Sequence, residues 1–253
     1  MLTRRRLLAA GCACALTAAC GPAGSLVDTR PALRLTAEPG EPGGPPPEPG
    51  PHPLGVAAER DALLHLPPAL PAGSVPLVVT LHGAGGDAAG GLGLLQGLAD
   101  EYGLVLLAPA SRGDTWDAVL GRPGPDVEVI DRALAAAIDV VPVDPARIAV
   151  AGFSDGASYA LGLGLANGDL FGRVLAFSPG FVPPDGRTGR PAIFVSHGDD
   201  DTVLPIDRTS RALVPALRED GYDVTYREFD GPHALPPEIA REGVEWLGWG
   251  RAG

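Results

Sequence analysis

A serine inside a Gly-x-Ser-x-Gly pentapeptide is the residue whose setting points most directly to chemistry. Ser154 lies at the centre of Gly152-Phe153-Ser154-Asp155-Gly156, after an apolar run (147–151) and before a small-residue, helix-compatible segment (157–166). A strand that turns sharply into a helix at a serine exposes the hydroxyl group, and small residues two positions on either side allow that close approach. The chain has 36 glycines, so the alternative is a glycine-rich turn. We interpret Ser154 as a nucleophile.

Two other groups of polar residues also follow strand-like runs. Three consecutive aspartates (199–201) come after the run 193–196, and His233 comes after the run 224–229. A carboxylate can orient a histidine, and the histidine can then accept the proton of a serine hydroxyl. In the order Ser, Asp, His, only His233 of the five histidines follows all three aspartates. The alternatives are an acidic solvated turn or helix cap, and a surface histidine.

A loop of small residues, His82-Gly83-Ala84-Gly85-Gly86-Asp87, follows the apolar run 77–81. Such a loop can aim a backbone N–H at a developing oxyanion, together with the N–H of the residue after the nucleophile. We therefore predict that the N–H groups of Ala84 and Asp155 form the oxyanion hole. We interpret His82 as bracing this loop, and also keep it as a candidate for contact with substrate.

The walls of the site are predicted from two bulky residues. Trp116 follows the strand-like run 104–108 and could either line a substrate pocket or pack in the core. Phe181 lies in the segment 178–190, which is rich in glycine and proline and too short for a helical lid. We expect an open, shallow cleft that buries little of a long acyl chain, and hence a preference for short acyl esters.

These residues need a scaffold that brings strand ends together. Apolar strand-like runs are 62–66, 77–81, 104–108, 148–151, 174–177, 193–196 and 224–229, and helix-like segments are 92–102, 126–140, 157–166, 207–220 and 237–246. Alternation of this kind predicts an α/β fold with a mostly parallel central sheet and helices on both faces. Functional residues of such sheets lie in loops at the carboxyl ends of the strands.

Residues 54–250 resemble the α/β-hydrolase superfamily. Similarity to the phospholipase/carboxylesterase group rests on Leu81-His82-Gly83, Gly152-Phe153-Ser154-Asp155-Gly156, His197-Gly198-x-x-Asp201-x-Val203-x-Pro205 and His233. Similarity to the polyhydroxybutyrate depolymerase/feruloyl esterase group rests on Gly124-Pro125-Asp126-Val127 and Val143-Asp144-Pro145-Ala146-Arg147-Ile148. The resemblance implies an α/β-hydrolase fold without a large lid domain, and Asp201 as the acid of the triad.

The resulting hypothesis is a serine carboxylic-ester hydrolase that uses Ser154, His233 and Asp201, needs no cofactor, and acts on a small-molecule or polymeric ester. A polyhydroxybutyrate depolymerase or feruloyl esterase with the same triad is the nearest alternative. A binding lipoprotein that kept the fold without catalysis is a second class, against which the complete triad argues. A peptidase is disfavoured because the chain has no propeller or large cap domain.

Composition excludes several other classes. The formal net charge is −12 and no basic cluster is present, which disfavours nucleic acid and anionic lipid as partners. All three cysteines, Cys12, Cys14 and Cys20, lie in the first 20 residues, so the domain has no thiol nucleophile. The histidines form no His-x-x-x-His pair, and we expect no metal site.

The amino terminus predicts export. Residues 1–20 combine a basic stretch (Arg4–Arg6) with a short apolar region and resemble a twin-arginine signal. Ala18-Ala19-Cys20 resembles a lipoprotein processing site, which would anchor the mature protein to a membrane through lipidated Cys20. Ala10-Gly11-Cys12 is a competing site with a very short apolar region before it, and the other alternative is ordinary cleavage and secretion. Residues 21–53 are rich in proline and glycine and are expected to form a disordered linker.

Overall fold

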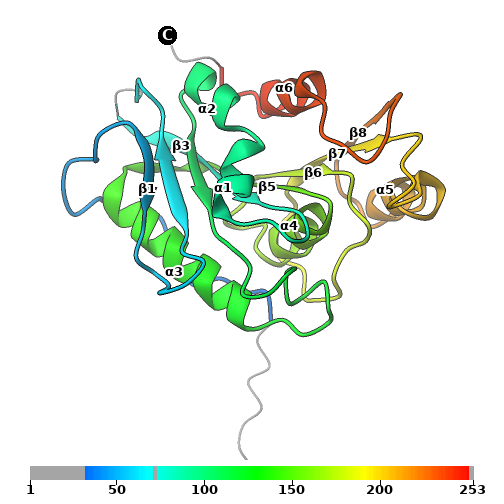
Figure 1. Cartoon of the computed structure of the whole chain (residues 1–253), viewed down its shortest axis with the longest axis horizontal. Coiled ribbons are helices and arrows are strands. Elements are labelled where there is room, and N and C mark those ends of the chain that lie inside the picture. Colours follow the sequence, from blue (N-terminus) through cyan, green and yellow to red (C-terminus); the bar gives the residue numbers. More distant parts are fainter. Residues whose placement is uncertain (1–31, 71–72, 251–253) are drawn as a thin grey trace, which may run out of the picture.

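A single eight-stranded sheet runs through the middle of the molecule, with helices on both of its faces (Figure 1). The structure is a computed structural model, which describes residues 32–70 and 73–250. The predicted export signal and Cys20 lie outside the described residues.

The strand order in the sheet is β1-β2-β4-β3-β5-β6-β7-β8. The strands are β1 (Gly50–Pro53), β2 (Leu63–Leu66), β3 (Val75–Leu81), β4 (Val105–Ala108), β5 (Val143–Phe153), β6 (Arg173–Phe177), β7 (Ala192–Gly198) and β8 (Val224–Phe229). Strands β1 and β2 pair antiparallel at one edge, and β4, β3, β5, β6, β7 and β8 pair parallel. Strands β3, β4 and β7 are buried throughout, as expected for a sheet covered on both faces.

Three helices cover each face. Helices α1 (Ala88–Gly93), α2 (Gln96–Tyr102) and α6 (Pro237–Trp246) pack on one face, and α3 (Pro125–Val140), α4 (Asp155–Ala166) and α5 (Ser210–Glu219) pack on the other (Figure 1). The predicted fold class is confirmed. The predicted helix 92–102 is two helices, because α1 ends at Gly93, and the predicted helix 207–220 starts with a separate 3₁₀ turn (Ile206–Arg208). None of the described helices is long and apolar enough to cross a membrane.

The prediction of a disordered linker is wrong for part of residues 32–53. Leu33 and Leu35 are buried in the core on the α3–α4 face, with 1% and 5% exposure. The N–H of Leu35 donates to Oδ1 of Asn167 at 2.8 Å, which satisfies a donor that no strand partner reaches. At the end of the segment, β1 pairs with β2. Alternate leucines and side-chain acceptors therefore order a segment that composition alone marks as flexible.

Candidate active site

Ser154 lies at the sharp turn between β5 and α4, with φ 57° and ψ −120°. This backbone conformation is strained for a residue other than glycine. The glycines on either side make the turn possible: a Cβ atom on Gly152 would lie 2.2 Å from the carbonyl oxygen of Gly156, and one on Gly156 would lie 2.2 Å from that of Leu81. The packed backbone thus holds the serine in a conformation that it would not adopt alone.

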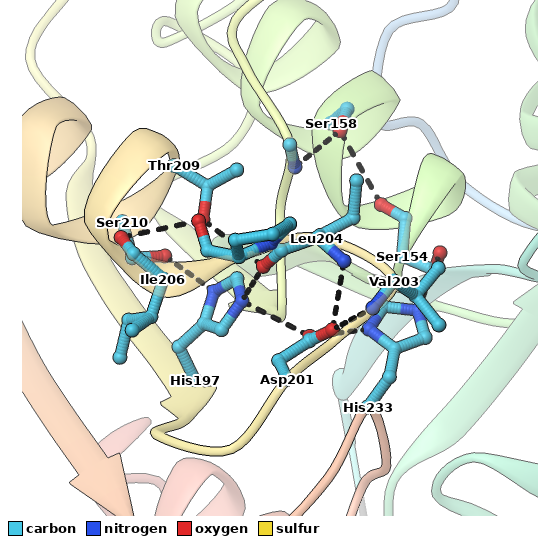
Figure 2. Close-up of polar contacts among 12 residues, drawn as sticks. Ser154, Ser158, His197, Asp201, Val203, Leu204, Ile206, Thr209, Ser210 and His233 are labelled. Atoms are coloured by element: carbon cyan, nitrogen blue, oxygen red, sulfur yellow. Dashed lines mark hydrogen bonds and ion pairs between the residues drawn. The ribbon is translucent and has the colours of Figure 1, made fainter.

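His233, in the loop after β8, faces Ser154 on one side and Asp201 on the other (Figure 2). Its Nε2 lies 2.9 Å from Oγ of Ser154, and its Nδ1 lies 2.6 Å from Oδ2 of Asp201. Because a carboxylate can only accept, the ring donates from Nδ1 and its Nε2 accepts the serine proton. This arrangement suits a general base that acts on Ser154.

The carboxylate of Asp201 is held at both oxygens. Oδ1 accepts hydrogen bonds from the N–H groups of Val203 at 2.9 Å and Leu204 at 2.7 Å, while Oδ2 faces His233 (Figure 2). Burial opposes ionisation of this carboxyl group, but the donors from Leu204, His233 and Val203 outweigh it and hold the pKa of Asp201 below its ordinary value. Asp201 is therefore a carboxylate at neutral pH, as an orienting acid must be.

The other two aspartates of the run 199–201 take different positions. Asp199 and Asp200 are exposed and lie with Asp230 as a surface group of carboxylates whose oxygens come within 4.8 Å of one another. Oδ1 of Asp199 accepts from the N–H of Gly231 at 3.1 Å, which ties the aspartate loop to the histidine loop. Of the three aspartates, Asp201 is the one that contacts His233.

Two backbone N–H groups remain available for a substrate oxygen. Within the described residues, the N–H groups of Ala84 and Asp155 donate no hydrogen bond. Asp155 is the first residue of α4, where a helix leaves its N–H groups unpaired and favours negative charge. The loop around Ala84 is held by the N–H of Gly85, which donates to the carbonyl of Asp114 at 2.6 Å. The assignment of these groups as the oxyanion hole stays a prediction.

A positive side chain that the sequence reading missed braces the same loop. The guanidinium of Arg60 donates to the carbonyl oxygens of Gly86 and Ser111, each at 2.5 Å. Arg60 precedes β2 and is remote in sequence from both partners, so no local pattern indicates this contact.

His82 and Trp116 do not line a substrate cleft, and their prediction as substrate-binding residues is wrong. Trp116 is fully buried; its Nε1 donates to the carbonyl of His82 at 2.8 Å, and its ring packs between His82 and Tyr159. His82 is 1% exposed, and its Nε2 accepts from the N–H of Ser111 at 3.0 Å. Burial lowers the pKa of His82, so the ring is neutral and braces the loop.

Phe181 remains a candidate for the rim of the site, since 40% of it is exposed. Its neighbour Gly180 donates from N–H to Oγ of Ser158 at 2.9 Å, and that hydroxyl donates to the carbonyl of Ser154 at 3.3 Å (Figure 2). This ties the segment after β6 to the first turn of α4. The segment between β6 and β7 contains no helix, so no lid of that kind covers the serine.

Two apolar residues near the triad were missed by the sequence reading. The ring of Phe153 packs against that of His233, with 4.8 Å between centroids. Val203, whose backbone N–H donates to Asp201, is 64% exposed. Phe153 occupies the x position of Gly-x-Ser, which the pattern leaves unspecified, and Val203 belongs to the motif His197-Gly198-x-x-Asp201-x-Val203, which does not indicate that its side chain is exposed beside the triad.

Comparisons with known proteins bear on the fold and on the family that the chain resembles. The family model described as phospholipase/carboxylesterase matches residues 127–241, which include Ser154, Asp201 and His233. The esterase PE8, whose crystal structure is known, superposes with a TM-score of 0.59 at 24% identity, over 73% of this chain and 95% of that chain. This structural likeness establishes the fold.

Two curated bacterial proteins are similar in sequence. NocK of Nocardia uniformis subsp. tsuyamanensis, provisionally named an esterase, is 32% identical over 171 residues, which are 59% of this chain and 47% of NocK. A poly(3-hydroxybutyrate) depolymerase of Ralstonia pickettii is 30% identical over 151 residues, which are 52% of this chain and 30% of the depolymerase. The chain thus spans half or less of the length of these relatives.

Proposed function

From the α/β-hydrolase fold of this chain, and its resemblance to the phospholipase/carboxylesterase group, we propose that it is a serine hydrolase of carboxylic esters. The observation that carries the proposal is the continuous hydrogen-bonded chain from Oγ of Ser154 through His233 to Asp201. Its three members come from three loops that follow β5, β7 and β8, and each hydrogen bond has the direction that general-base catalysis needs.

In the acylation step, Oγ of Ser154 attacks the carbonyl carbon of the ester while Nε2 of His233 takes the serine proton. The carbonyl oxygen becomes an oxyanion, which the N–H groups of Ala84 and Asp155 bind. The intermediate collapses as the C–O bond to the alcohol breaks. His233 gives its proton to the leaving alkoxide, so an acyl-serine and a free alcohol result.

In the deacylation step, a water molecule attacks the acyl carbon and gives a proton to Nε2 of His233. The second oxyanion uses the same two N–H groups. When the bond to Oγ breaks, His233 returns the proton to Ser154 and the carboxylic acid leaves. Throughout the cycle Asp201 stays ionised and balances the positive charge that His233 carries for part of it.

The experiment that tests the proposal is hydrolysis of a panel of p-nitrophenyl esters from C2 to C12 by the wild-type enzyme and by Ser154→Ala. We expect wild-type turnover and a loss in kcat on the order of 10⁴ to 10⁶ in the variant. His52→Ala, on the edge strand β1, is the matched control and should leave kcat unchanged. Absence of turnover on every ester by folded wild-type enzyme would contradict the proposal.

A polyester is the second candidate substrate, because one relative is a poly(3-hydroxybutyrate) depolymerase. The same triad would cleave such a polymer by the same steps. Release of 3-hydroxybutyrate from an amorphous film, compared with hydrolysis of a feruloyl ester, separates these alternatives from a short-chain esterase. The segment between β6 and β7 contains no helix that could act as a lid, which is compatible with either a small ester or a polymer chain as substrate.

We also propose that the protein is exported and anchored through a lipidated Cys20, on the sequence of residues 1–20. A lipidated protein should partition into the detergent phase, and Cys20→Ser should move it to the aqueous phase. Cys12→Ser is the matched control and should not. An intact mass that shows an unmodified amino terminus would contradict the anchor and leave export open.

A further inference from the structure

A second buried histidine contacts the acid of the triad from the side opposite His233. Nε2 of His197, at the end of β7, lies 3.1 Å from Oδ2 of Asp201 and 2.8 Å from the carbonyl oxygen of Leu204 (Figure 2). The side chains of His197 and Asp201 are both fully buried. Oδ2 of Asp201 is therefore shared between two imidazole rings, and His233 is the ring that also contacts Ser154.

The hydrogen bonds of His197 define where its proton lies. The carbonyl of Leu204 can only accept, so Nε2 carries a hydrogen. Nδ1 lies 2.7 Å from Oγ of Ser210, the first residue of α5, whose hydroxyl donates to the unprotonated nitrogen of a neutral ring. Burial lowers the pKa of His197, although the carbonyl of Leu204 and the carboxylate of Asp201 oppose this, so the ring is neutral at neutral pH.

The charged and titratable groups around His197 come from four elements. Asp201 and His233 lie on their own loops, and Glu228 stands opposite His197 in the register of β7 and β8. Glu228 forms an exposed ion pair with Arg211 of α5. The charge of Glu228 is thus matched by its own partner, which leaves Asp201 as the anion to which His197 donates.

We propose that His197 is a positioning residue of the triad, which fixes the carboxylate of Asp201 through a neutral Nε2–H shared with the carbonyl of Leu204. This inference rests on the proposed function. With His197 in place, Asp201 has donors at both oxygens: two N–H groups at Oδ1 and two imidazole N–H groups at Oδ2. These four groups oppose rotation of the carboxylate away from His233.

The second N–H also sets how much of the charge of Asp201 is felt by His233. A hydrogen bond to the ionised carboxylate stabilises the carboxylate and partly neutralises its negative charge. Without His197, the carboxylate stabilises protonated His233 more strongly, while its geometry loosens. Activity should then be lost at a higher pH on the acidic side, and kcat should fall because the base is held less well. KM should change little, since His197 is buried and cannot touch substrate.

The experiment compares His197→Leu, which fills the space without a donor, with His197→Gln, whose amide nitrogen can reach the place of Nε2. For His197→Leu we expect kcat to fall by about 10- to 100-fold, the scale of one hydrogen bond to a charged group. The pH at which kcat/KM falls to half on the acidic side should rise by about 0.5 to 1 unit. His197→Gln should retain kcat within about fivefold of wild type.

The matched control is His65→Leu, which removes another buried histidine paired with an aspartate. Nε2 of His65 lies 2.7 Å from Oδ1 of Asp100, and the pair belongs to β2 and α2, outside the triad. It should lower the melting temperature and leave the pH profile in place. If His197→Leu does not fold, His197→Asn replaces it, because this amide is one methylene too short to reach Leu204.

An unchanged pH profile in folded His197→Leu or His197→Asn would overturn the positioning role, and so would losses in His197→Gln as large as those in His197→Leu. Failure of the proposed function has a different signature. In that case wild type itself hydrolyses no ester and takes up no fluorophosphonate, whereas failure of the positioning role leaves wild type fully active.

Discussion

Replacement of Asp201 by asparagine should abolish most of the activity while leaving the fold intact. An amide has one acceptor and one donor end, whereas Asp201 accepts at both oxygens. If the amide oxygen keeps the N–H groups of Val203 and Leu204, its NH₂ group faces Nδ1 of His233. Nδ1 of His233 must then accept a hydrogen bond, so the hydrogen of the neutral ring moves to Nε2. With a hydrogen on Nε2, His233 cannot deprotonate Ser154.

The opposite orientation of the amide is costly as well. It would set an NH₂ group against the two N–H groups of Val203 and Leu204, which leaves buried donors unpaired at about 1 to 3 kcal/mol each. The first orientation therefore prevails, and the wrong tautomer of His233 results. In a triad of this kind the loss is about 10⁴ in kcat, which corresponds to about 5 kcal/mol at 1.36 kcal/mol per decade.

The assay is kcat on p-nitrophenyl acetate for Asp201→Asn beside Asp199→Asn and Asp200→Asn, with circular dichroism as the check on folding. The two controls remove one charge each from the same loop, but at exposed positions. We expect Asp199→Asn to raise the activation free energy by about 1 kcal/mol at most, because its contact with the N–H of Gly231 is weakened. Asp200→Asn should raise the activation free energy by less. Comparable losses at all three positions would mean that the loop acts through total charge, and the tautomer argument would be wrong.

Three other predictions concern the turn, the pH range and the cleft. Gly156→Ala should destabilise the protein by about 3 kcal/mol or more, because its Cβ would lie 2.2 Å from a backbone oxygen. Gly97→Ala in α2, where open space surrounds the position, should stabilise the protein by about 0.5 to 1 kcal/mol. Similar melting temperatures for the two variants would contradict the packing argument. The pKa of buried His82 is depressed, so unfolding below about pH 6.5 takes up a proton, and the free energy of unfolding falls as pH drops from there toward the folded pKa. Urea unfolding should show a shallower fall of this free energy with pH for His82→Gln than for wild type. Equal slopes of the free energy of unfolding against pH would refute the assignment. Esters of roughly C2 to C6 should have higher kcat/KM than C12 esters, and a steady rise in kcat/KM with chain length would reveal a deep acyl pocket and contradict the predicted shallow cleft.

The parts of the fold that sequence predicts well are those with strong local patterns. The predicted strand 224–229 and helix 237–246 have the bounds of β8 and α6, because apolar periodicity and flanking turn residues specify both. Leu33 and Leu35 were not predicted to be buried because they lie just before the proline- and glycine-rich stretch 38–51, and composition alone groups them with it. Their burial depends on Asn167 and Asp185, which lie more than 130 residues away.

The candidate site divides in the same way. Ser154 and His233 follow strands in a fixed order, so a pattern along the chain suffices to predict them, whereas the choice of Asp201 among three consecutive aspartates rests on the family resemblance. Trp116 shows the limit of such reasoning. Its position after β4 is compatible with a cleft wall, but its contacts with His82 and Tyr159 place it in the core. The second contact of Asp201, with His197, depends on the fold of the aspartate loop around Leu204, which residue spacing does not predict.

The most direct test of the central claim is peptide mapping by mass spectrometry after reaction with a fluorophosphonate, which traps an activated serine. We predict one phosphonyl adduct per molecule, on Ser154, that is absent in Ser154→Ala and formed far more slowly in His233→Ala. An adduct on another serine, or labelling of Ser154→Ala at the wild-type rate, would contradict the assignment of Ser154 as the nucleophile of an ester hydrolase.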